Sequence, residues 1–489
     1  MRYCWRSSLF IFLAVISFTS GVTHSASASD SDEGDSRPNF IFMIGDDMAV
    51  ETLNCYGVGS DAAHTPNLDN LCRQGLRFDN FWAQPVCSPT RATLLTGQYG
   101  FANGVGSPAG TIPGVDWSIP GQEAVQVNTR QGGMGGMAGA QVQASGTEVR
   151  QGLKADAYTF IQALSSSGYQ TAAVGKWHLA DENNGGLEHP LKIGFDHYSG
   201  SLRGGGVSTY NAWSKVVDGS EPFGKTGYVT SDTVDDGVSW LNQTDTSRPF
   251  FLWVAFNAPH TPFHMPPKEL LSAKTASINP RSATAHQMYT AMIEAMDTEI
   301  GRLISSLDQE TRERTYVVFM GDNGTPGQVE VTAPFARSQV KGSVYQGGVN
   351  VPFMVAGPDV GSGQVTKSLA NSVDVFNTVL ELTDVQPEKN TAMHSVSLTP
   401  ILLQDVNADV RHFAYSDVFG PARNGSRDSR AIRNNEYKLI QHRLDGKEEL
   451  YNLSIDPYEN NNLLLNGLSE SDKEGYDWLR QELAELAGE

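Results

Sequence analysis

Four short, continuous apolar runs place the strongest constraint on the fold of this 489-residue chain. None of them alternates apolar with polar residues, which is typical of strands buried on both faces of a parallel sheet. Helical periodicity lies between the runs, first at Phe160, Ile161 and Leu164 before Gly168 and again over Met288–Leu303. Alternating strands and helices predict a largely parallel α/β sheet. The predicted strands are Asn39–Ile44, Thr171–Val174, Phe250–Phe256 and Tyr316–Met320.

Each predicted strand leads directly into a polar cluster. The clusters read G-D-D after the first strand, G-K-W-H after the second, N-A-P-H after the third and G-D-N-G after the fourth. The carboxyl ends of parallel strands meet at one edge of the sheet, and α/β proteins bind their ligands beyond that edge. The sequence therefore predicts one functional site to which all four clusters contribute.

The N-terminus has the pattern of a secretory signal peptide. Arg2 and Arg6 precede a short apolar run, which ends in small residues at Ala26–Ala28. The apolar part is too short for a stable membrane anchor, although an uncleaved anchor is the alternative. We interpret residues 1–28 as a signal peptide and residues 29–36 as an acidic leader. The expected protein is exported, either periplasmic or secreted.

The cysteine count points to one unusual thiol. Cleavage after residue 28 would remove Cys4 and leave Cys55, Cys72 and Cys87. An odd number of cysteines in an exported protein leaves one thiol unpaired or modified. Cys55 and Cys72 could pair, which would leave Cys87 alone and fits a special role for it.

The charge of the chain restricts its partners. The formal net charge is −20, and it would be −22 without the two signal-peptide arginines. An acidic chain argues against nucleic acid as a partner, because binding a phosphate backbone needs clustered cations. An anionic substrate would therefore have to be held by a local cluster of cations and a metal. No later segment approaches the roughly 18 apolar residues of a membrane span.

Two regions depart from the alternation of strands and helices. Residues 101–153 form a long segment rich in glycine, alanine and glutamine, which is typical of a functional lid or a mobile loop. Beyond residue 411, antiparallel strand patterns over Ala431–Gln441 and Glu449–Asn452 precede a helical pattern near Ser469–Leu486. The expected division is a main domain over 37–410 and a small α+β subdomain over 411–489.

The segment V-C-S-P-T-R-A-T-L-L-T-G-Q places Cys87 at the predicted start of a helix. Pro89 suits the first turn, because its missing N–H would be unpaired there in any residue. A helix N-terminus favours an anion, and Arg91 lies one turn later on the same face. This arrangement suits attack on a tetrahedral oxyanion. A buried cysteine without a chemical role is the alternative that this segment alone leaves open.

Oxygen ligands follow two of the predicted strands. Asp46 and Asp47 come after the first strand, and Asp322 and Asn323 come after the fourth. Ligation by oxygen alone selects a hard cation such as Ca²⁺ or Mg²⁺. Adjacent carboxylates would repel one another without such a cation. The sequence therefore predicts a hard-cation site at this edge of the sheet.

Cations and histidines complete the predicted site. Lys176 and His178 follow the second strand, His260 follows the third, and Lys341 lies further along the chain. Lysines can neutralise an oxyanion, and a histidine can protonate a departing alcohol. A single histidine in a turn is more often structural, but two at predicted strand ends favour a catalytic role.

The segment C-S-P-T-R-A-T-L-L-T-G resembles the Cys-x-Pro-x-Arg signature of the formylglycine-dependent (type I) sulfatases of the alkaline phosphatase-like superfamily. Other landmarks of the family are I-G-D-D, G-K-W-H-L, N-A-P-H-T-P, G-D-N-G, K-G-S-V-Y-Q-G-G-V-N-V-P and E-L-Y-N-L-S-I-D-P-Y-E-N-N-N-L. The resemblance extends from Pro38 to Leu465. Gln346 stands where many relatives have Glu, and Ala180 where they have Gly. The resemblance implies a sulfate-ester hydrolase with an alkaline phosphatase-like core, whose mixed, largely parallel sheet is flanked by helices, and a small C-terminal α+β subdomain.

The resemblance also implies a role for each candidate residue. A formylglycine-generating enzyme would oxidise Cys87 to formylglycine (3-oxoalanine), and the hydrated gem-diol would attack sulfur. Arg91 and Lys176 would stabilise that side chain, and His178 would take a proton from the diol to break down the sulfated intermediate. His260, as the general acid, and Lys341 would contact the sulfate and the leaving oxygen. One Ca²⁺ ion would be held by Asp46, Asp47, modified Cys87, Asp322 and Asn323.

The expected substrate is a sulfated carbohydrate, with small aryl sulfates as an alternative. A phosphodiesterase or phosphonate monoester hydrolase of the same superfamily is a second alternative, and a catalytically inactive binder of sulfated glycans is a third. The acidic chain favours monosaccharides or short oligosaccharides over long polyanions, which it would repel. Candidate substrate contacts, chosen by their position in the chain, are Trp117, Arg130, Arg203, Tyr210 and His264.

Overall fold

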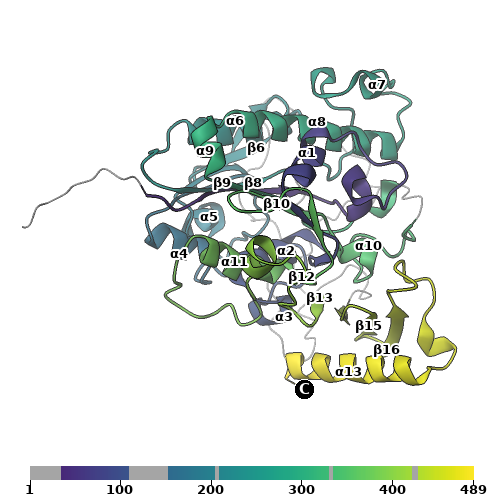
Figure 1. The fold of residues 1–489 in the computed structure, drawn as a ribbon. Coiled ribbons are helices and arrows are strands. Elements are labelled where there is room, and N and C mark those ends of the chain that lie inside the picture. The colour runs from purple at the N-terminus through teal and green to yellow at the C-terminus, as the bar shows by residue number, and fades with distance from the viewer. Residues whose placement is uncertain (1–34, 110–151, 204–208, 330–333, 421–427, 489) are drawn as a thin grey trace, which may run out of the picture. The chain divides into compact units, whose positions relative to one another are not determined.

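A ten-stranded sheet is the central element of the computed structural model, which describes residues 35–109, 152–203, 209–329, 334–420 and 428–488 (Figure 1). Its strands are β1 Asn39–Gly45, β2 Leu76–Phe78, β4 Gln170–Lys176, β5 His197–Ser201, β6 Ala212–Val217, β7 Phe223–Thr226, β8 Phe250–Ala255, β9 Thr315–Gly321, β10 Phe353–Ala356 and β11 Gln364–Thr366. Their spatial order is β11-β2-β10-β9-β1-β8-β4-β5-β6-β7. Strands β9, β1, β8, β4 and β5 run parallel, whereas β10, β6 and β7 pair antiparallel. The predicted mixed, largely parallel sheet is confirmed.

The four strands expected from the apolar runs lie side by side at the centre of this sheet. They are β9, β1, β8 and β4, and all four are buried along nearly their whole length. Their ends are in register, with Gly45 opposite Gly321, and Ile44 and Gly175 both opposite Ala255. The polar residues that follow these strands therefore emerge at one edge.

Helices cover both faces of the sheet. The helices of the described residues are α1 Pro66–Gln74, α2 Cys87–Thr96, α3 Gly100–Asn103, α4 Phe160–Ser166, α5 His189–Lys192, α6 Val229–Leu241, α7 Ala273–Ala276, α8 Ala285–Ser305, α9 Gln309–Glu313, α10 Gln346–Val349, α11 Val375–Leu382, α12 Thr399–Leu403 and α13 Glu470–Ala487. Helices α1, α6 and α8 pack on one face, and α2, α4 and α11 on the other (Figure 1). Short 3-10 turns are Val50–Thr52, Asn54–Tyr56, Gly186–Glu188, Lys268–Leu270, Gly327–Val329, Ser372–Asp374 and Leu463–Leu465.

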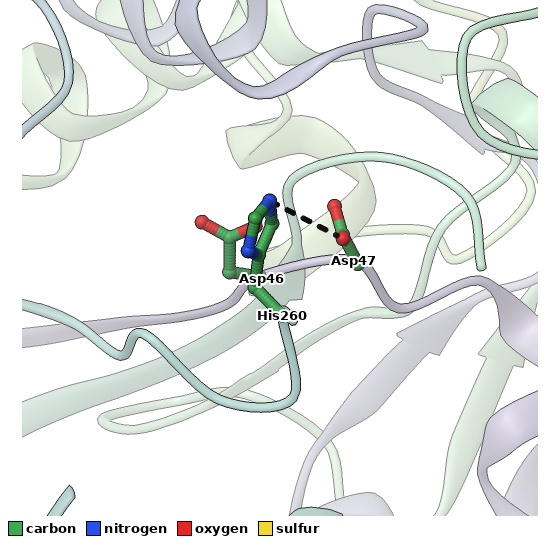
Figure 2. A group of neighbouring side chains, drawn as sticks. All are labelled: Asp46, Asp47 and His260. Carbon is green, nitrogen blue, oxygen red and sulfur yellow. Dashed lines mark ion pairs between the residues drawn. The ribbon is translucent and has the colours of Figure 1, made fainter. Parts of the chain in front are cut away.

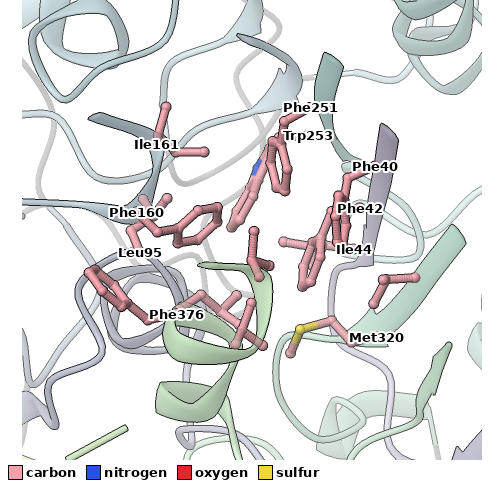
Figure 3. Close-up of a cluster of buried hydrophobic side chains, with 14 of the residues drawn as sticks. Phe40, Phe42, Ile44, Leu95, Phe160, Ile161, Phe251, Trp253, Met320 and Phe376 are labelled. Carbon is pink, nitrogen blue, oxygen red and sulfur yellow. The ribbon is translucent and has the colours of Figure 1, made fainter. Parts of the chain in front are cut away.

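Side-chain alternation along β1 explains the two layers of core. Phe40, Phe42 and Ile44 face α2, α4 and α11, where Figure 3 shows Leu95, Phe160 and Phe376 packed toward them. Ile41 and Met43 face the opposite way, into the cluster that includes the α8 methionines. Because both faces are covered, the strand needs apolar residues at every position.

The C-terminal residues form a second sheet. Strands β13 Ala414–Val418, β14 Ser429–Arg433, β15 Tyr437–His442 and β16 Lys447–Asn452 pair antiparallel in this order, and α13 packs on β15. The pattern over Ala431–Gln441 is therefore two strands and the turn between them. A two-stranded pair is formed by β3 Phe81–Trp82, which precedes α2 in the chain, and β12 Ala370–Asn371, which precedes α11.

Some sequence predictions fall partly or wholly outside the described residues. The predicted signal peptide and most of the acidic leader do so, and so does most of the long segment 101–153, of which Phe101–Asn103 belong to α3. Within the described ranges, no helix is long and apolar enough to cross a membrane.

Cys55 and Cys72 form a disulfide between the turn at Asn54–Tyr56 and helix α1. The bridge closes a loop with a sequence separation of 17 residues. Replacing both cysteines with serine is expected to lower the free energy of unfolding by about 3 kcal/mol, because the unfolded chain regains the entropy of the open loop. Urea unfolding monitored by fluorescence measures this loss. A reductant should shift the parent's transition toward that of the double variant and leave the variant's transition in place, and a parent insensitive to reductant would contradict the prediction.

Candidate active site

Polar residues gather where the four central strands end. Asp46 and Asp47 follow β1, Lys176 is the last residue of β4, and Asp322 and Asn323 follow β9. All of these side chains are buried. His178 and His260 lie two and five residues beyond β4 and β8, and the side chain of His260 is 17% exposed.

Helix α2 points its N-terminus at this cluster. Cys87 is the first residue of α2, and its Sγ lies 3.1 Å from Nδ1 of His178. Arg91, one turn later, is fully buried, and its Nη2 donates to Asp46 Oδ2 at 3.1 Å and to Asp322 Oδ2 at 2.9 Å. Its Nη1 donates to the Lys176 carbonyl at 2.8 Å. One guanidinium thus ties α2 to the ends of β1, β4 and β9.

The oxygen-rich residues are held by a network of hydrogen bonds. The Asp47 N–H donates to Asp322 Oδ1 at 3.0 Å, and Asn323 Nδ2 donates to Asp47 Oδ1 at 2.8 Å. The Tyr289 hydroxyl donates to the Asp47 carbonyl at 2.6 Å and fixes the left-handed backbone there, with φ of 74°. The network leaves Oδ1 of Asp46 and Oδ1 of Asn323 buried without a hydrogen-bond partner.

These two orphaned oxygens fit a hard cation. Ligand atoms of Asp46, Asp47 and His260 lie within 4.8 Å of one another, as do those of Asp46, Cys87 and Asp322. A buried carboxylate or amide oxygen without a partner is costly, and coordination of a cation would satisfy it. Carboxylate and amide oxygens are the ligands that Ca²⁺ prefers. The predicted donor set thus fits such an ion.

The site balances three carboxylates against three cations. Lys176 forms an ion pair with Asp46, and Lys341 forms one with Asp47. Burial favours the neutral form of each group, but Lys176 and the other nearby cations outweigh it at Asp46 and hold the pKa of its carboxyl below its usual range. The charge of Asp47 likewise outweighs burial at Lys341 and raises its pKa. Both lysines therefore stay protonated beside the carboxylates.

The two histidines are neutral, and the proton of His260 can be assigned to one ring nitrogen. Burial, together with Lys341 and Lys176, lowers the pKa of His260 to about 3, and burial lowers that of His178 well below its usual value. His260 Nδ1 lies 2.9 Å from the carbonyl of Thr261, so it must donate there, since a carbonyl only accepts. Its Nε2 faces Asp47 Oδ2 at 3.8 Å (Figure 2). Nε2 is therefore the atom of His260 that can exchange a proton with a ligand.

Cys87 is the free cysteine of the described chain. Its side chain is 3% exposed, and burial raises the pKa of the thiol to about 11. Reactive cysteines in enzymes have lowered pKa values, because the thiolate is the nucleophile. As it stands, the thiol of Cys87 does not have that character.

The structure places three of the five predicted substrate contacts. Arg203 follows β5 and is half-buried, and the rings of Tyr210 and His264 are 4.3 Å apart. The Tyr210 hydroxyl is buried and shares its one proton between the carbonyls of Asn257 and His260, at 2.6 and 2.7 Å, so this side chain supports the His260 loop. Trp117 and Arg130 lie outside the described residues. Substrate contact by any of the five remains a prediction.

Several residues that support the site were not among the residues predicted from the sequence. Tyr289 lies on α8, more than two hundred residues from the Asp47 carbonyl that it contacts, and looks in sequence like any core aromatic. Ser88 and Thr90 lie within the segment 86–98 that contains the helix of Cys87, yet their roles depend on contacts with the His178 and Asp322 carbonyls. For these two, their place beside Cys87 is the signal that could have found them.

Comparison with known proteins identifies the family. The family model "Sulfatase" matches residues 38–385, and the model "N-sulphoglucosamine sulphohydrolase, C-terminal" matches residues 340–487. The chain is 29% identical to N-acetylgalactosamine-6-sulfatase of Homo sapiens over 77% of this chain and 68% of the relative. It is 25% identical to an arylsulfatase of Klebsiella aerogenes over 74% of this chain and 89% of the relative.

Solved structures share the fold. A protein in complex with its substrate D-glucosamine-2-N,6-O-disulfate superposes with a TM-score of 0.71, at 23% identity, over 92% of this chain and 98% of the other. A protein in complex with k-i-k-neocarrahexaose has a TM-score of 0.70, at 24% identity, over 92% of each chain. The family model spans most of the chain and includes every strand-end cluster described above. The chain therefore belongs to the sulfatase family of the alkaline phosphatase-like superfamily and is a sulfuric ester hydrolase.

Proposed function

We propose that this protein hydrolyses a sulfate ester of a carbohydrate, using a formylglycine formed from Cys87 and one calcium ion. The observation that carries the proposal is the position of Cys87. It lies at the N-terminus of α2, with His178 at 3.1 Å, and shares a ligand cluster with Asp46 and Asp322. A nucleophile at this point meets a helix N-terminus, cations and a metal site together.

The calcium ion would be held by the oxygens of Asp46, Asp47, Asp322 and Asn323, with the modified side chain at position 87. When bound, it would neutralise charge on the sulfate and polarise its oxygens. The chain's own part is to hold these ligands in place. Arg91 bridges Asp46 and Asp322, and the Asn323 amide donates to Asp47, so these carboxylates are fixed in place while Oδ1 of Asp46 stays free for coordination.

The side chain at position 87 would supply the attacking hydroxyl once a formylglycine-generating enzyme has oxidised the thiol to an aldehyde and water has hydrated it. The Cys87 thiol itself, buried and protonated, is a poor candidate for that role. His178 presents Nδ1 at this side chain and would take a proton from it. Arg91 and Lys176, whose charges are fixed by Asp46 and Asp322, would stabilise the developing negative charge.

His260 and Lys341 would act on the leaving group. Binding of an anionic sulfate ester beside His260 would favour a second proton on the ring, at Nε2, because Nδ1 already donates its proton to the Thr261 carbonyl. Nε2 would then give this second proton to the departing alcohol. Lys341, which is protonated beside Asp47, would bind a sulfate oxygen and neutralise its charge. Both side chains are slightly exposed, 17% and 13%, which places them on the open side of an otherwise buried site.

Replacing His260 with alanine tests the general acid directly. We expect turnover of a sugar sulfate to fall by roughly 10²- to 10⁴-fold, because an alkoxide leaves poorly without a proton. Turnover of nitrophenyl sulfate should fall much less, because nitrophenolate leaves unprotonated. Initial rates of sulfate and nitrophenolate release measure the two effects. His286→Ala, which alters a histidine paired with Asp61 away from the strand-end cluster, is the control and should keep the ratio of the two rates. Equal losses on both substrates in His260→Ala would contradict the assignment.

A sulfated carbohydrate is the substrate class that the relatives support. One relative is named for N-acetylgalactosamine 6-sulfate, one solved structure holds a sulfated glucosamine, and another holds a neocarrahexaose. The net charge of −20 adds a preference for monosaccharides and short oligosaccharides, because long polyanions would be repelled. Export to the periplasm or the medium, as proposed from residues 1–28, would place the enzyme where such sugars occur.

The proposal is tested with protein co-expressed with a formylglycine-generating enzyme. Mass spectrometry of the tryptic peptide containing residue 87 should show a loss of about 18 Da relative to cysteine. Sulfate release is then measured on sulfated hexosamines, sulfated oligosaccharides and an aryl sulfate, and release of the alcohol or phenol is measured on a phosphodiester. Release from a sugar sulfate supports the proposal. A modified peptide with activity on the phosphodiester or aryl sulfate alone would redirect the substrate assignment, and an unmodified, inactive protein would overturn the proposed mechanism.

A further inference from the structure

Ser88 contacts the main chain of a predicted catalytic residue. It follows Cys87 in the first turn of α2, and its side chain is fully buried. Its hydroxyl donates to the carbonyl of His178 at 2.7 Å and accepts from the N–H of Ala109 at 2.8 Å. A hydroxyl has one proton to donate, and here that proton is committed to the backbone of His178.

The backbone of His178 is strained where Ser88 holds it. His178 has φ of 60°, in the left-handed region that side chains other than glycine rarely adopt. Its N–H donates to the Leu202 carbonyl at 3.2 Å, so both polar groups of this residue's main chain have one partner from another segment. Strained conformations of this kind persist only where the surrounding structure holds them.

Two consecutive residues of α2 therefore contact His178 at two points, its ring and its carbonyl. The side chain of Cys87 lies 3.1 Å from the His178 ring, and the side chain of Ser88 bonds to the His178 carbonyl. Without the Ser88 hydroxyl, the carbonyl would be buried with no donor from α2, and the left-handed backbone would be free to relax. Relaxation about φ would swing the ring away from the atom on which it acts.

We propose that Ser88 is a positioning residue, which holds the His178 ring in line with the side chain at position 87 by fixing the His178 peptide. The inference rests on the proposed role of position 87 as the nucleophile and deepens it. Ser88 does not touch the substrate. Its loss should therefore lower kcat and leave KM near the parental value, since substrate contacts stay in place.

The test compares Ser88→Ala with Ser88→Thr, which keeps the hydroxyl. Ser416→Ala is the matched control, because Ser416 is also fully buried and donates to a main-chain carbonyl, that of Ala83, at 3.0 Å. Kinetics are expressed per mole of formylglycine, measured on the peptide with residue 87, because Ser88 lies within the modified segment. Displacement of a reacting group by about 1 Å can cost 10²-fold, so we expect kcat of Ser88→Ala to fall roughly 10- to 100-fold. Ser88→Thr should recover most of this loss, and Ser416→Ala should keep parental kcat.

Crystal structures of the parent and Ser88→Ala in the unmodified Cys87 form provide a readout that needs no activity. We expect His178 in the variant to leave the left-handed region and its Nδ1 to move away from Cys87. An unchanged His178, or a Ser88→Ala enzyme with parental kcat per formylglycine, would overturn the inference. A variant that only lowers the formylglycine content would also overturn it, because Ser88 would then matter for maturation alone. If Ser88→Ala does not fold, Ser88→Cys, which fills the same space as a weaker donor, takes its place with the same expected outcomes. An inactive, unmodified parent would count against the proposed function and leave the crystallographic comparison decisive for Ser88.

Discussion

Replacing Cys87 with alanine is expected to reduce sulfate-ester hydrolysis by roughly 10⁴-fold or more, because the side chain that becomes the nucleophile is lost. Lys341 and His260 would still contact the sulfate, so substrate affinity should change far less than turnover. The measurement is single-turnover sulfate release together with binding of the unhydrolysed substrate. Substitutions of the proposed calcium ligands would break ion pairs, whereas Cys87→Ala leaves the ion pairs among Asp46, Arg91 and Lys176 in place.

Cys87→Ser is the matched variant, since it keeps nearly the same volume at a site that is 3% exposed. It should be equally inactive in a host that cannot modify serine, and its melting temperature should stay near that of the parent. The double variant of Cys55 and Cys72 is the opposite control, because it is expected to lose stability while Cys87 stays in place. Full activity of Cys87→Ser in a host without serine modification would refute the mechanism.

Removal of calcium is expected to have the second largest effect. Dialysis against a calcium chelator should lower turnover by about 10²-fold or more, because several kcal/mol of charge stabilisation at the sulfate are lost. It should also destabilise the fold, since calcium at about a thousand times its Kd adds about 4 kcal/mol to the free energy of unfolding. The second effect needs no substrate and is measured by thermal melting over a calcium titration. Metal analysis should give one calcium ion per chain.

Two substitutions of Asn323 test whether its side chain is one of the calcium ligands. Asn323→Leu removes the orphaned Oδ1, so the melting temperature should no longer rise with calcium. Asn323→Asp keeps oxygen ligands but adds a fourth carboxylate beside Asp47, so its stability should depend on calcium more strongly than that of the parent. Asp236→Asn, which alters a carboxylate paired with Lys215 away from the site, is the control and should keep the parental response. If neither the chelator nor added calcium changes the melting temperature of the parent protein, a calcium ion at this site is ruled out.

The central strands were predictable because each has an unambiguous local cause. Asn39–Ile44 became β1 with one further residue, and Thr171–Val174 became the middle of β4. Strands covered by helices on both faces need apolar residues at every position, and that requirement is visible in the sequence. The C-terminal hairpin was less clear, because β14 is buried at every position although it carries Arg430 and Arg433, so its residue types do not show its burial. There the turn within Ala431–Gln441, between β14 and β15, was missed.

The membership of the site was also predictable, because polar residues directly after buried strands have one edge to occupy. Asp46, Lys176 and Asp322 meet there, and Cys87 begins α2 as its proline and arginine spacing indicates. The pairing of Cys55 with Cys72, which the cysteine count left open, is now seen as a disulfide.

The sequence by itself thus determined the strands, the edge where they end and the chemical types gathered there, because these depend on local pattern and on the order of elements. Only the tertiary structure decided how each group is held. The left-handed backbone of His178, its support by Ser88, and the Tyr289 hydroxyl on the Asp47 carbonyl join segments far apart in the chain. Such contacts depend on distances and directions in space, and no spacing within the sequence encodes them.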